Sequence, residues 1–362
     1  LMKRVTLSFM LLALLISISG MWFVLNTQWG LERFYALVQH SIPGKLSVQT
    51  LHGKVVGPIK LTGLNYKNDE IDVSLDMLEL DWQPSRLLSG TFRLTELNAH
   101  DLSVKLTTPS SEGTSKPLPD LTLPLAIDVL EARLSKALIS RNQKQLFLIK
   151  RLELEGTAKN SSIQLAQLRI ETEQLDSTVY GQLGLSSKRP VELHTNWTAR
   201  FTGLTPLNGT GTFTGSLKRL ALQQTVKQPG IDVTLHGYLA NVISEFNWNL
   251  SLDIRQLDAR QLASFWPDYS TRGKLKSNGR VAEFSLSGEL ASSLPKYGTL
   301  QTKFKINAKP QVWHLTNFTT KHTATDGTLH AGGYWHPGPN LGTLELSGNW
   351  NQVVFPLSAD ST

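Results

Sequence analysis

The sequence predicts an all-β body behind one N-terminal transmembrane helix. From Lys45 onward, apolar residues recur at every second position, which is the period of a strand with one apolar and one polar face. Gly, Asn, Asp and Pro separate these runs, as hairpin turns require. Only two short helical connectors are expected, at 84–90 and 257–266, so helices that could cover a sheet are scarce.

The composition excludes several classes of protein. The 362-residue chain carries a net charge of +7, yet it has no run of five Lys or Arg and no interleaving of aromatic and basic residues. We therefore expect no nucleic-acid partner. Because the chain has no cysteine, disulfides, thiol nucleophiles and cysteine metal sites are excluded.

Residues 5–25 contain no charged residue, and a helix of that length spans about 30 Å, one hydrocarbon core. Lys3 and Arg4 precede it, so the N-terminus is predicted to be cytoplasmic and the body to lie outside. The alternative is a cleaved signal peptide, with Ser17 and Ser19 before the cut. The predicted single-pass anchor occupies 1–27, with apolar residues Leu7, Phe9, Leu11, Leu14, Ile16, Trp22 and Phe23.

The rest of the chain divides by composition. Residues 28–44 are predicted to form a juxtamembrane amphipathic helix, which Pro43-Gly44 would end. A first β unit is expected at 45–106. A linker rich in Pro, Ser, Thr and Gly follows at 107–124, and an extended repetitive β region is expected at 125–362.

One strand pattern changes phase. In 71–82 the apolar positions alternate up to Met77 and then continue from Leu78 on the other parity. We predict a bulge near Met77–Leu78, which would keep one continuous apolar face and bend the strand.

Catalytic signatures are lacking. The glycines at 209, 211 and 215 do not match a dinucleotide fingerprint and are interpreted as part of a hairpin. His330 and His336 are interpreted as a surface turn. Asp76, Glu79 and Asp81 are interpreted as a solvated face. We therefore expect neither an enzyme nor a metal or cofactor site.

Residues 51–106 resemble the N-terminal segment of the TamB family, in the AsmA-like group. The matching features are Gly53, Gly57 and Pro58, the Gly63-Leu64-x-Tyr66 turn, Trp82-x-Pro84 with Leu87-Leu88, and Leu97. Residues 118–139 and 262–281 also look similar to passages of the family. The resemblance implies an inner-membrane-anchored periplasmic rod with an apolar inner face, similar to bridge-like lipid-transfer proteins. It also implies a partner similar to the TamA outer-membrane barrel, engaged through a C-terminal part that this chain would lack.

With that resemblance, we expect an elongated, curved antiparallel sheet that forms an open, taco-like apolar groove for phospholipid. The alternation of apolar and polar residues fits a closed β-sandwich equally well, so the sandwich is retained as an alternative. So do two other functions: a scaffold that assembles or secretes outer-membrane β proteins such as autotransporters, and a periplasmic tether without cargo. The candidate lining residues are Val73, Leu75, Leu80, Trp82, Trp197, Phe246, Trp248, Leu250, Phe284 and Leu286.

Overall fold

The computed structural model describes residues 19–20, 22–106, 122–141, 144–185, 190–242, 246–295, 298–338 and 342–353. Among these residues no helix is both long enough and apolar enough to cross a membrane. Most of the predicted anchor, including Leu7, Phe9, Leu11, Leu14 and Ile16, lies outside the described residues. Trp22 and Phe23 lie in a short helical segment, and their side chains are 68% and 64% exposed.

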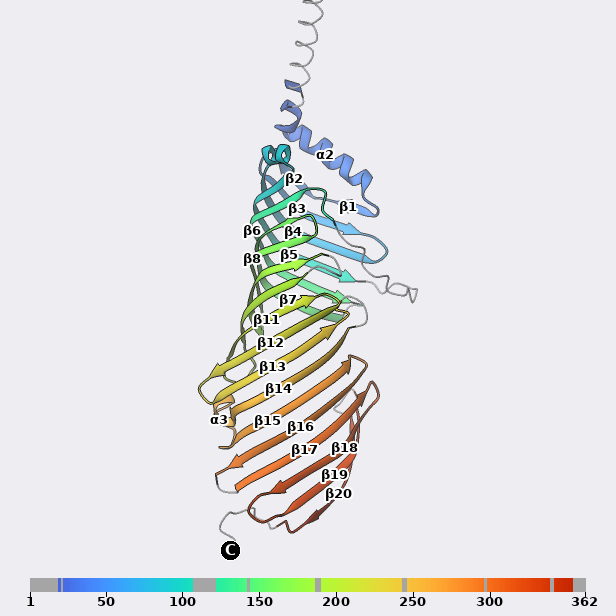
Figure 1. Cartoon of the computed structure of the whole chain (residues 1–362). Helices are drawn as coiled ribbons and strands as arrows, with labels where there is room; N and C mark the ends of the chain where they lie inside the picture. The colour runs from blue at the N-terminus through green and yellow to red at the C-terminus, as the bar shows by residue number, and fades with distance from the viewer. Residues whose placement is uncertain are drawn as a thin grey trace, which may run out of the picture. The chain divides into compact units, whose positions relative to one another are not determined.

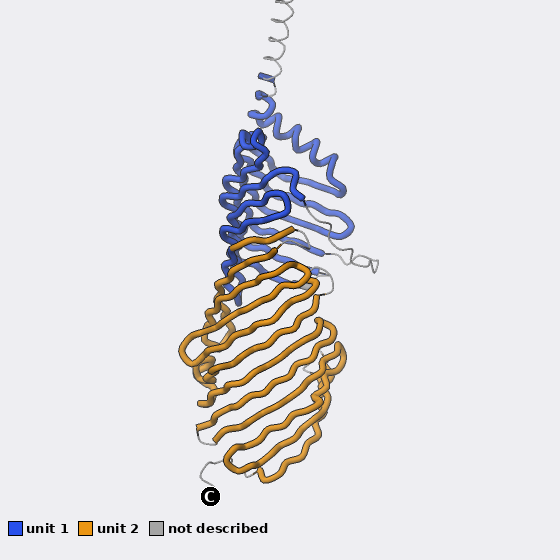
Figure 2. The backbone as a smooth tube through the Cα atoms, viewed as in Figure 1, with its two compact units in different colours: residues 1–114, 122–180 blue, residues 115–121, 181–362 orange. Residues whose placement is uncertain are grey.

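The chain divides into two compact units (Figure 2). Unit 1 comprises residues 1–114 and 122–180, and unit 2 comprises residues 115–121 and 181–362. This division follows spatial proximity, whereas the segments predicted above follow composition, so those boundaries stay predictions.

After the short helical segment at 22–25, the described elements of unit 1 are helix α2, the 3-10 helix η1 and nine strands. They are α2 (Gln28–Ser41), β1 (Lys45–Ser47), β2 (Thr50–Gly53), β3 (Ile59–Lys67), β4 (Ile71–Gln83), the 3-10 helix η1 (Pro84–Ser89), β5 (Thr91–Leu106), β6 (Ala126–Arg141), β7 (Lys144–Lys159), β8 (Ser162–Thr172) and β9 (Leu175–Gly184, whose last residues belong to unit 2).

Helix α2 forms inside the segment that the sequence predicts to be helical. The Thr27 hydroxyl accepts a hydrogen bond from the Gly30 amide and so caps the first turn. The helix ends at Ser41, before the extended backbone at Ile42 and the turn at Pro43-Gly44. Leu31 faces inward and is only 3% exposed.

The side chains of α2 cover the edge of the sheet. Both β1 and β2 pair with β3. The Gln28 amide group donates to the Leu51 carbonyl at 2.6 Å and accepts from the Gly53 amide at 2.9 Å, much as a neighbouring strand would. Gln39 donates to the Leu46 carbonyl of β1 at 2.8 Å. Bonds of this kind occupy strand-edge groups that would otherwise be open to pairing.

The phase change predicted in 71–82 is real, but its mechanism differs from a bulge. On each of β3 to β6 the apolar positions switch from one parity to the other at a single residue. These four residues lie side by side across the sheet: Gly63, Asp76, Asp101 and Lys136. The pairing register of β4 with β3 and with β5 is the same before and after Asp76. The register of β4 against β5 shifts later, between Asp81 and Trp82. The predicted bulge at Met77–Leu78 is therefore wrong.

On β3, β5 and β6 the backbone explains the phase change. Gly63, Asp101 and Lys136 have φ of 60°, 53° and 60°. A single left-handed residue reverses the alternation of side chains without adding a residue, so the apolar face stays continuous. Asp101 also forms an ion pair with Lys136 on the adjacent strand.

The sheet of unit 1 is not wholly antiparallel, which corrects the predicted fold class. Strands β5 and β6 pair in parallel, Thr91 beside Ala126 through to Leu106 beside Arg141. A parallel pair needs a connection that returns along the whole strand. Here β5 has 16 residues and spans about 50 Å, so the linker predicted at 107–124 is long enough to make that return.

Unit 2 continues with strands and one short helix. They are β10 (Val191–Ala199), β11 (Leu207–Ser216), β12 (Arg219–Gln228), β13 (Ile231–Ala240), β14 (Asn247–Asp258), α3 (Ala259–Leu262), β15 (Ser270–Arg280), β16 (Glu283–Leu294), β17 (Gly298–Lys309), β18 (Val312–His322), β19 (Thr328–His336) and β20 (Thr343–Asn351).

Each of these strands pairs antiparallel with the next along the chain. Figure 1 shows them as one curled, open layer. The glycine stretch at 209–215 lies inside β11 of a hairpin, as predicted. Helix α3 and η1 occupy the two predicted helical connectors.

Candidate functional site

The sheet of unit 2 has one face that is apolar from strand to strand. The register aligns one residue of each strand in a row across that face. The first row is Val191, Gly215, Leu220, Leu239, Trp248, Gly279, Phe284, Ala308, Trp313, Trp335 and Leu344. The next row is Leu193, Phe213, Leu222, Gly237, Leu250, Ser277, Leu286, Ile306, Leu315, Gly333 and Leu346. Ser277 is the one polar member of the two rows.

Aromatic side chains lie against one another along the first row. Trp248 lies 5.9 Å from Phe246 and 5.8 Å from Phe284 between ring centroids. Phe284 lies 5.4 Å from Trp313, which lies 4.8 Å from Trp335. Tilted and edge-on contacts at these distances are favourable. The rings thus form a continuous apolar strip from β14 to β19.

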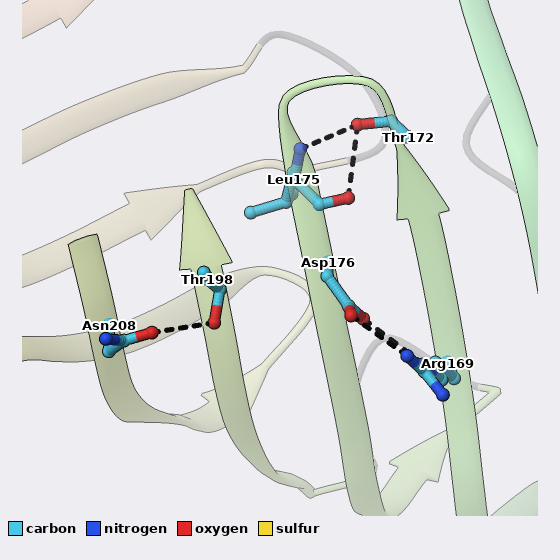
Figure 3. A network of polar contacts seen from close by, with 6 residues as sticks. All are labelled: Arg169, Thr172, Leu175, Asp176, Thr198 and Asn208. Carbon is cyan, nitrogen blue, oxygen red and sulfur yellow. Dashed lines mark hydrogen bonds and ion pairs between the residues drawn. The ribbon is translucent and has the colours of Figure 1, made fainter. Parts of the chain in front are cut away.

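The opposite face is polar in the same register. One row there is Glu192, Thr214, Ala221, Tyr238, Asn249, Asn278, Ser285, Asn307, His314, Tyr334 and Glu345. Thr198 donates to the Asn208 side chain on this face at 2.8 Å (Figure 3). Because side chains alternate along a strand, this face is suited to water and the other is not.

Unit 1 has the same two-faced construction. Its apolar face includes the row Leu64, Leu75, Leu102, Ala137 and Ile149. Its outer face carries the row Lys60, Glu79, Asn98, Arg133, Glu153 and Arg169. Arg169 pairs with Asp176 on β9 at 2.9 Å, and Thr172 bonds Leu175 in the turn between them (Figure 3).

All ten predicted lining residues lie on these apolar faces. In unit 1, Val73, Leu75, Leu80 and Trp82 follow β4 on either side of the parity change. Trp82 donates through its ring N–H to the Val55 carbonyl at 2.8 Å, and its ring lies tilted against Phe92 at 5.3 Å between centroids. In unit 2 the remaining members are Trp197, Phe246, Trp248, Leu250, Phe284 and Leu286.

The apolar face of unit 2 is left open by the described chain. Trp248, Leu250, Phe284 and Leu286 keep part of their surface exposed. At β17 to β20 the face borders a hollow of about 550 Å³, lined by Ile306, Trp313, Leu315, Trp335, Leu344 and Leu346 among others. Leu344 and Leu346 are 62% and 57% exposed. A closed sandwich would have buried these side chains.

Sequence reasoning missed those six lining residues as site members. The signal was present, because Leu344 and Leu346 alternate with Glu345 and Ser347 in β20. Trp335 was harder to assign, since it lies beside Tyr334, which stacks on His314 on the polar face.

Several polar atoms on the apolar face have partners from the chain itself. The Trp248 ring N–H donates to the Ser277 hydroxyl at 2.9 Å. Trp197 and Thr195 both donate to the Gln224 side-chain oxygen, at 2.8 and 3.1 Å. These bonds lower the cost of placing polar groups beside apolar ones.

Two of the resolved pKa shifts lie at exposed ion pairs. Lys60 donates to Glu79 at 2.5 Å, and this bond and the lysine charge lower the pKa of Glu79. A bond from Lys321 and its charge likewise lower the pKa of Asp326. Among the described residues, no group of three or more His, Cys, Asp or Glu is placed to hold a metal ion.

We expect Lys60→Ala to raise the pKa of Glu79 toward its ordinary value, because both the bond and the charge are lost. A lowered carboxyl pKa stabilises the fold above the unfolded pKa, and that contribution is lost as pH falls through the lowered value. Both groups are exposed, so the change in stability is expected to be slight. Side-chain NMR titration of Glu79 tests this, with Lys321→Ala as a control that leaves Glu79 unchanged.

Each unit is thus an open β-sheet with one apolar and one polar face, which defines a groove-like β architecture. The chain belongs to the family described as TamB, N-terminal domain, whose model matches residues 15–118 and 111–347. No curated protein and no solved structure matches the chain significantly. Family membership is consistent with an inner-membrane-anchored periplasmic protein.

Proposed function

We propose that the chain conducts phospholipids between the inner and outer membranes, with acyl chains lying on the apolar faces of the two units. The observation that carries the proposal is the row-by-row register of unit 2, which keeps apolar residues on one face of every strand from β10 to β20. The proposal needs no catalytic residue, metal or cofactor, so the chain is not expected to be an enzyme.

The physical reason is the cost of carrying acyl chains through water. About thirty methylenes at ~0.8 kcal/mol each amount to roughly 25 kcal/mol for one phospholipid. An apolar face removes most of that cost without recognising a particular headgroup. A polar outer face keeps the same sheet soluble. In this proposal the body is periplasmic, the partner membrane is the inner one, and a TamA-like outer-membrane barrel receives the lipid.

The proposal is tested by photo-crosslinking from two adjacent residues of β14. Leu250 lies on the apolar face, and its neighbour Asn249 lies on the polar face. A photoreactive residue at 250 is expected to label phospholipid in intact cells, whereas one at 249 is expected to label little. Equal lipid labelling from both positions, or none from either, would contradict the proposal.

A second function is a scaffold for outer-membrane β proteins, including autotransporters. The observation in its favour is strand β20, which pairs with β19 and whose residues are all exposed. An exposed strand edge can template a client strand. This scaffold predicts protein crosslinks from Glu345 or Asn349 and no lipid crosslinks from Leu250. A cargo-free tether predicts neither.

A further inference from the structure

Helix α2 has apolar residues on both of its faces. Leu31 faces the sheet and is buried, whereas Trp29, Phe34 and Leu37 are 53%, 51% and 67% exposed. Trp22 and Phe23, just before the helix, are exposed as well. These three outward side chains of α2 leave more than half of their surface uncovered by the described chain. Exposed apolar side chains that lie together mark an interaction surface.

The 3-10 helix η1 adds to the same surface. Leu88 is 95% exposed and Leu87 is 39% exposed. In Figure 1, η1 is the short cyan coil beside the start of α2. Hydrogen bonds hold the two together through the β2–β3 connection: Trp82, just before η1, bonds the Val55 carbonyl, and the Val56 amide bonds the Leu25 carbonyl at 3.2 Å.

The chemistry of this surface fits the headgroup region of a bilayer. Arg33 lies over the Trp29 ring, 5.3 Å from its centroid. Arg86 lies in η1 beside Leu87 and Leu88. Exposed Trp and Leu with neighbouring Arg are typical of segments that lie in the membrane interface. The uncharged run 5–25 also leads directly into this surface.

We propose that Trp29, Phe34, Leu37, Leu87 and Leu88 form a docking surface that lies in the interface of the bilayer into which residues 5–25 are predicted to insert. The surface would hold unit 1 against the membrane. Trp82 and Phe92, which flank η1 in sequence, are among the first residues of the apolar face. That face would therefore begin within a few residues of the lipid headgroups.

The test uses the absence of cysteine from the chain, which allows a single fluorophore at each chosen position. The full chain with Leu37→Cys or Leu88→Cys carries an environment-sensitive NBD label and is reconstituted into phosphatidylethanolamine–phosphatidylglycerol vesicles. Some of the lipid carries a doxyl quencher high on the acyl chain. Gln167→Cys, exposed on β8 of the same unit, is the control.

We expect doxyl lipid to quench the labels at positions 37 and 88 several-fold more than the label at 167. Quenching at positions 37 and 88 that is no greater than at 167 would overturn the docking surface. Strong quenching at only one of the two positions would overturn the proposal that α2 and η1 both contribute to it. The readout does not depend on lipid in the groove, so it separates this inference from the proposed function.

Discussion

Leu250→Asp is expected to slow lipid passage about 100-fold while leaving the chain folded and anchored. Leu250 lies in the middle of the second apolar row, between Gly237 on β13 and Ser277 on β15. A hydrated carboxylate there interrupts the apolar face over one strand spacing of about 4.8 Å. About four methylenes then lose apolar contact at ~0.8 kcal/mol each, roughly 3 kcal/mol. That corresponds to a slowing of about 100-fold.

The matched control is Asn249→Asp, which adds the same charge one residue away on the polar face. Lipid delivery to the outer membrane, followed with labelled phospholipid in cells that depend on this chain, is expected to fall for the first variant alone. Equal transport by Leu250→Asp and by the unchanged chain would contradict the conduit. Loss of transport in both variants would indicate an effect of charge rather than of the apolar face.

Gly237→Ala is expected to destabilise unit 2 by about 3 kcal/mol. Gly237 has φ +147°, which L residues rarely adopt, and a Cβ there would collide with the Asn249 carbonyl oxygen and lie 2.9 Å from the Leu250 Cα. The collision is with backbone, so a rotamer change cannot relieve it. This glycine allows β13 and β14 to approach on the apolar face.

Thermal unfolding of the detergent-solubilised chain, followed by circular dichroism, measures the effect. Gly332→Ala is the control, because its φ is not in that region and its nearest contact would be the Leu315 carbonyl oxygen at 3.3 Å. We expect a clear fall in Tm for the first variant and a small change for the second. Similar Tm values for both variants would show that the β13 backbone tolerates a side chain.

The sequence alone determined which residues share a face. Alternation with a period of two assigned Leu250 and Asn249 to opposite faces, and the structure places them so. Side-chain direction in a strand is a local property, so pattern predicts it well. The connectors at 84–90 and 257–266 were likewise predictable from local signals.

Tertiary structure decided the features that depend on pairing between distant segments. The parity change of β4 lies in register with left-handed residues on other strands, Gly63, Asp101 and Lys136, and no pattern within 71–82 could show that. The parallel pairing of β5 with β6 also depends on segments that the linker separates.

An open layer and a closed sandwich have the same alternation of apolar and polar residues along their strands. The sequence pattern shows which face is apolar, but it does not show what covers that face. Only the arrangement of the strands in space left Leu344 and Leu346 uncovered beside the hollow on the apolar face.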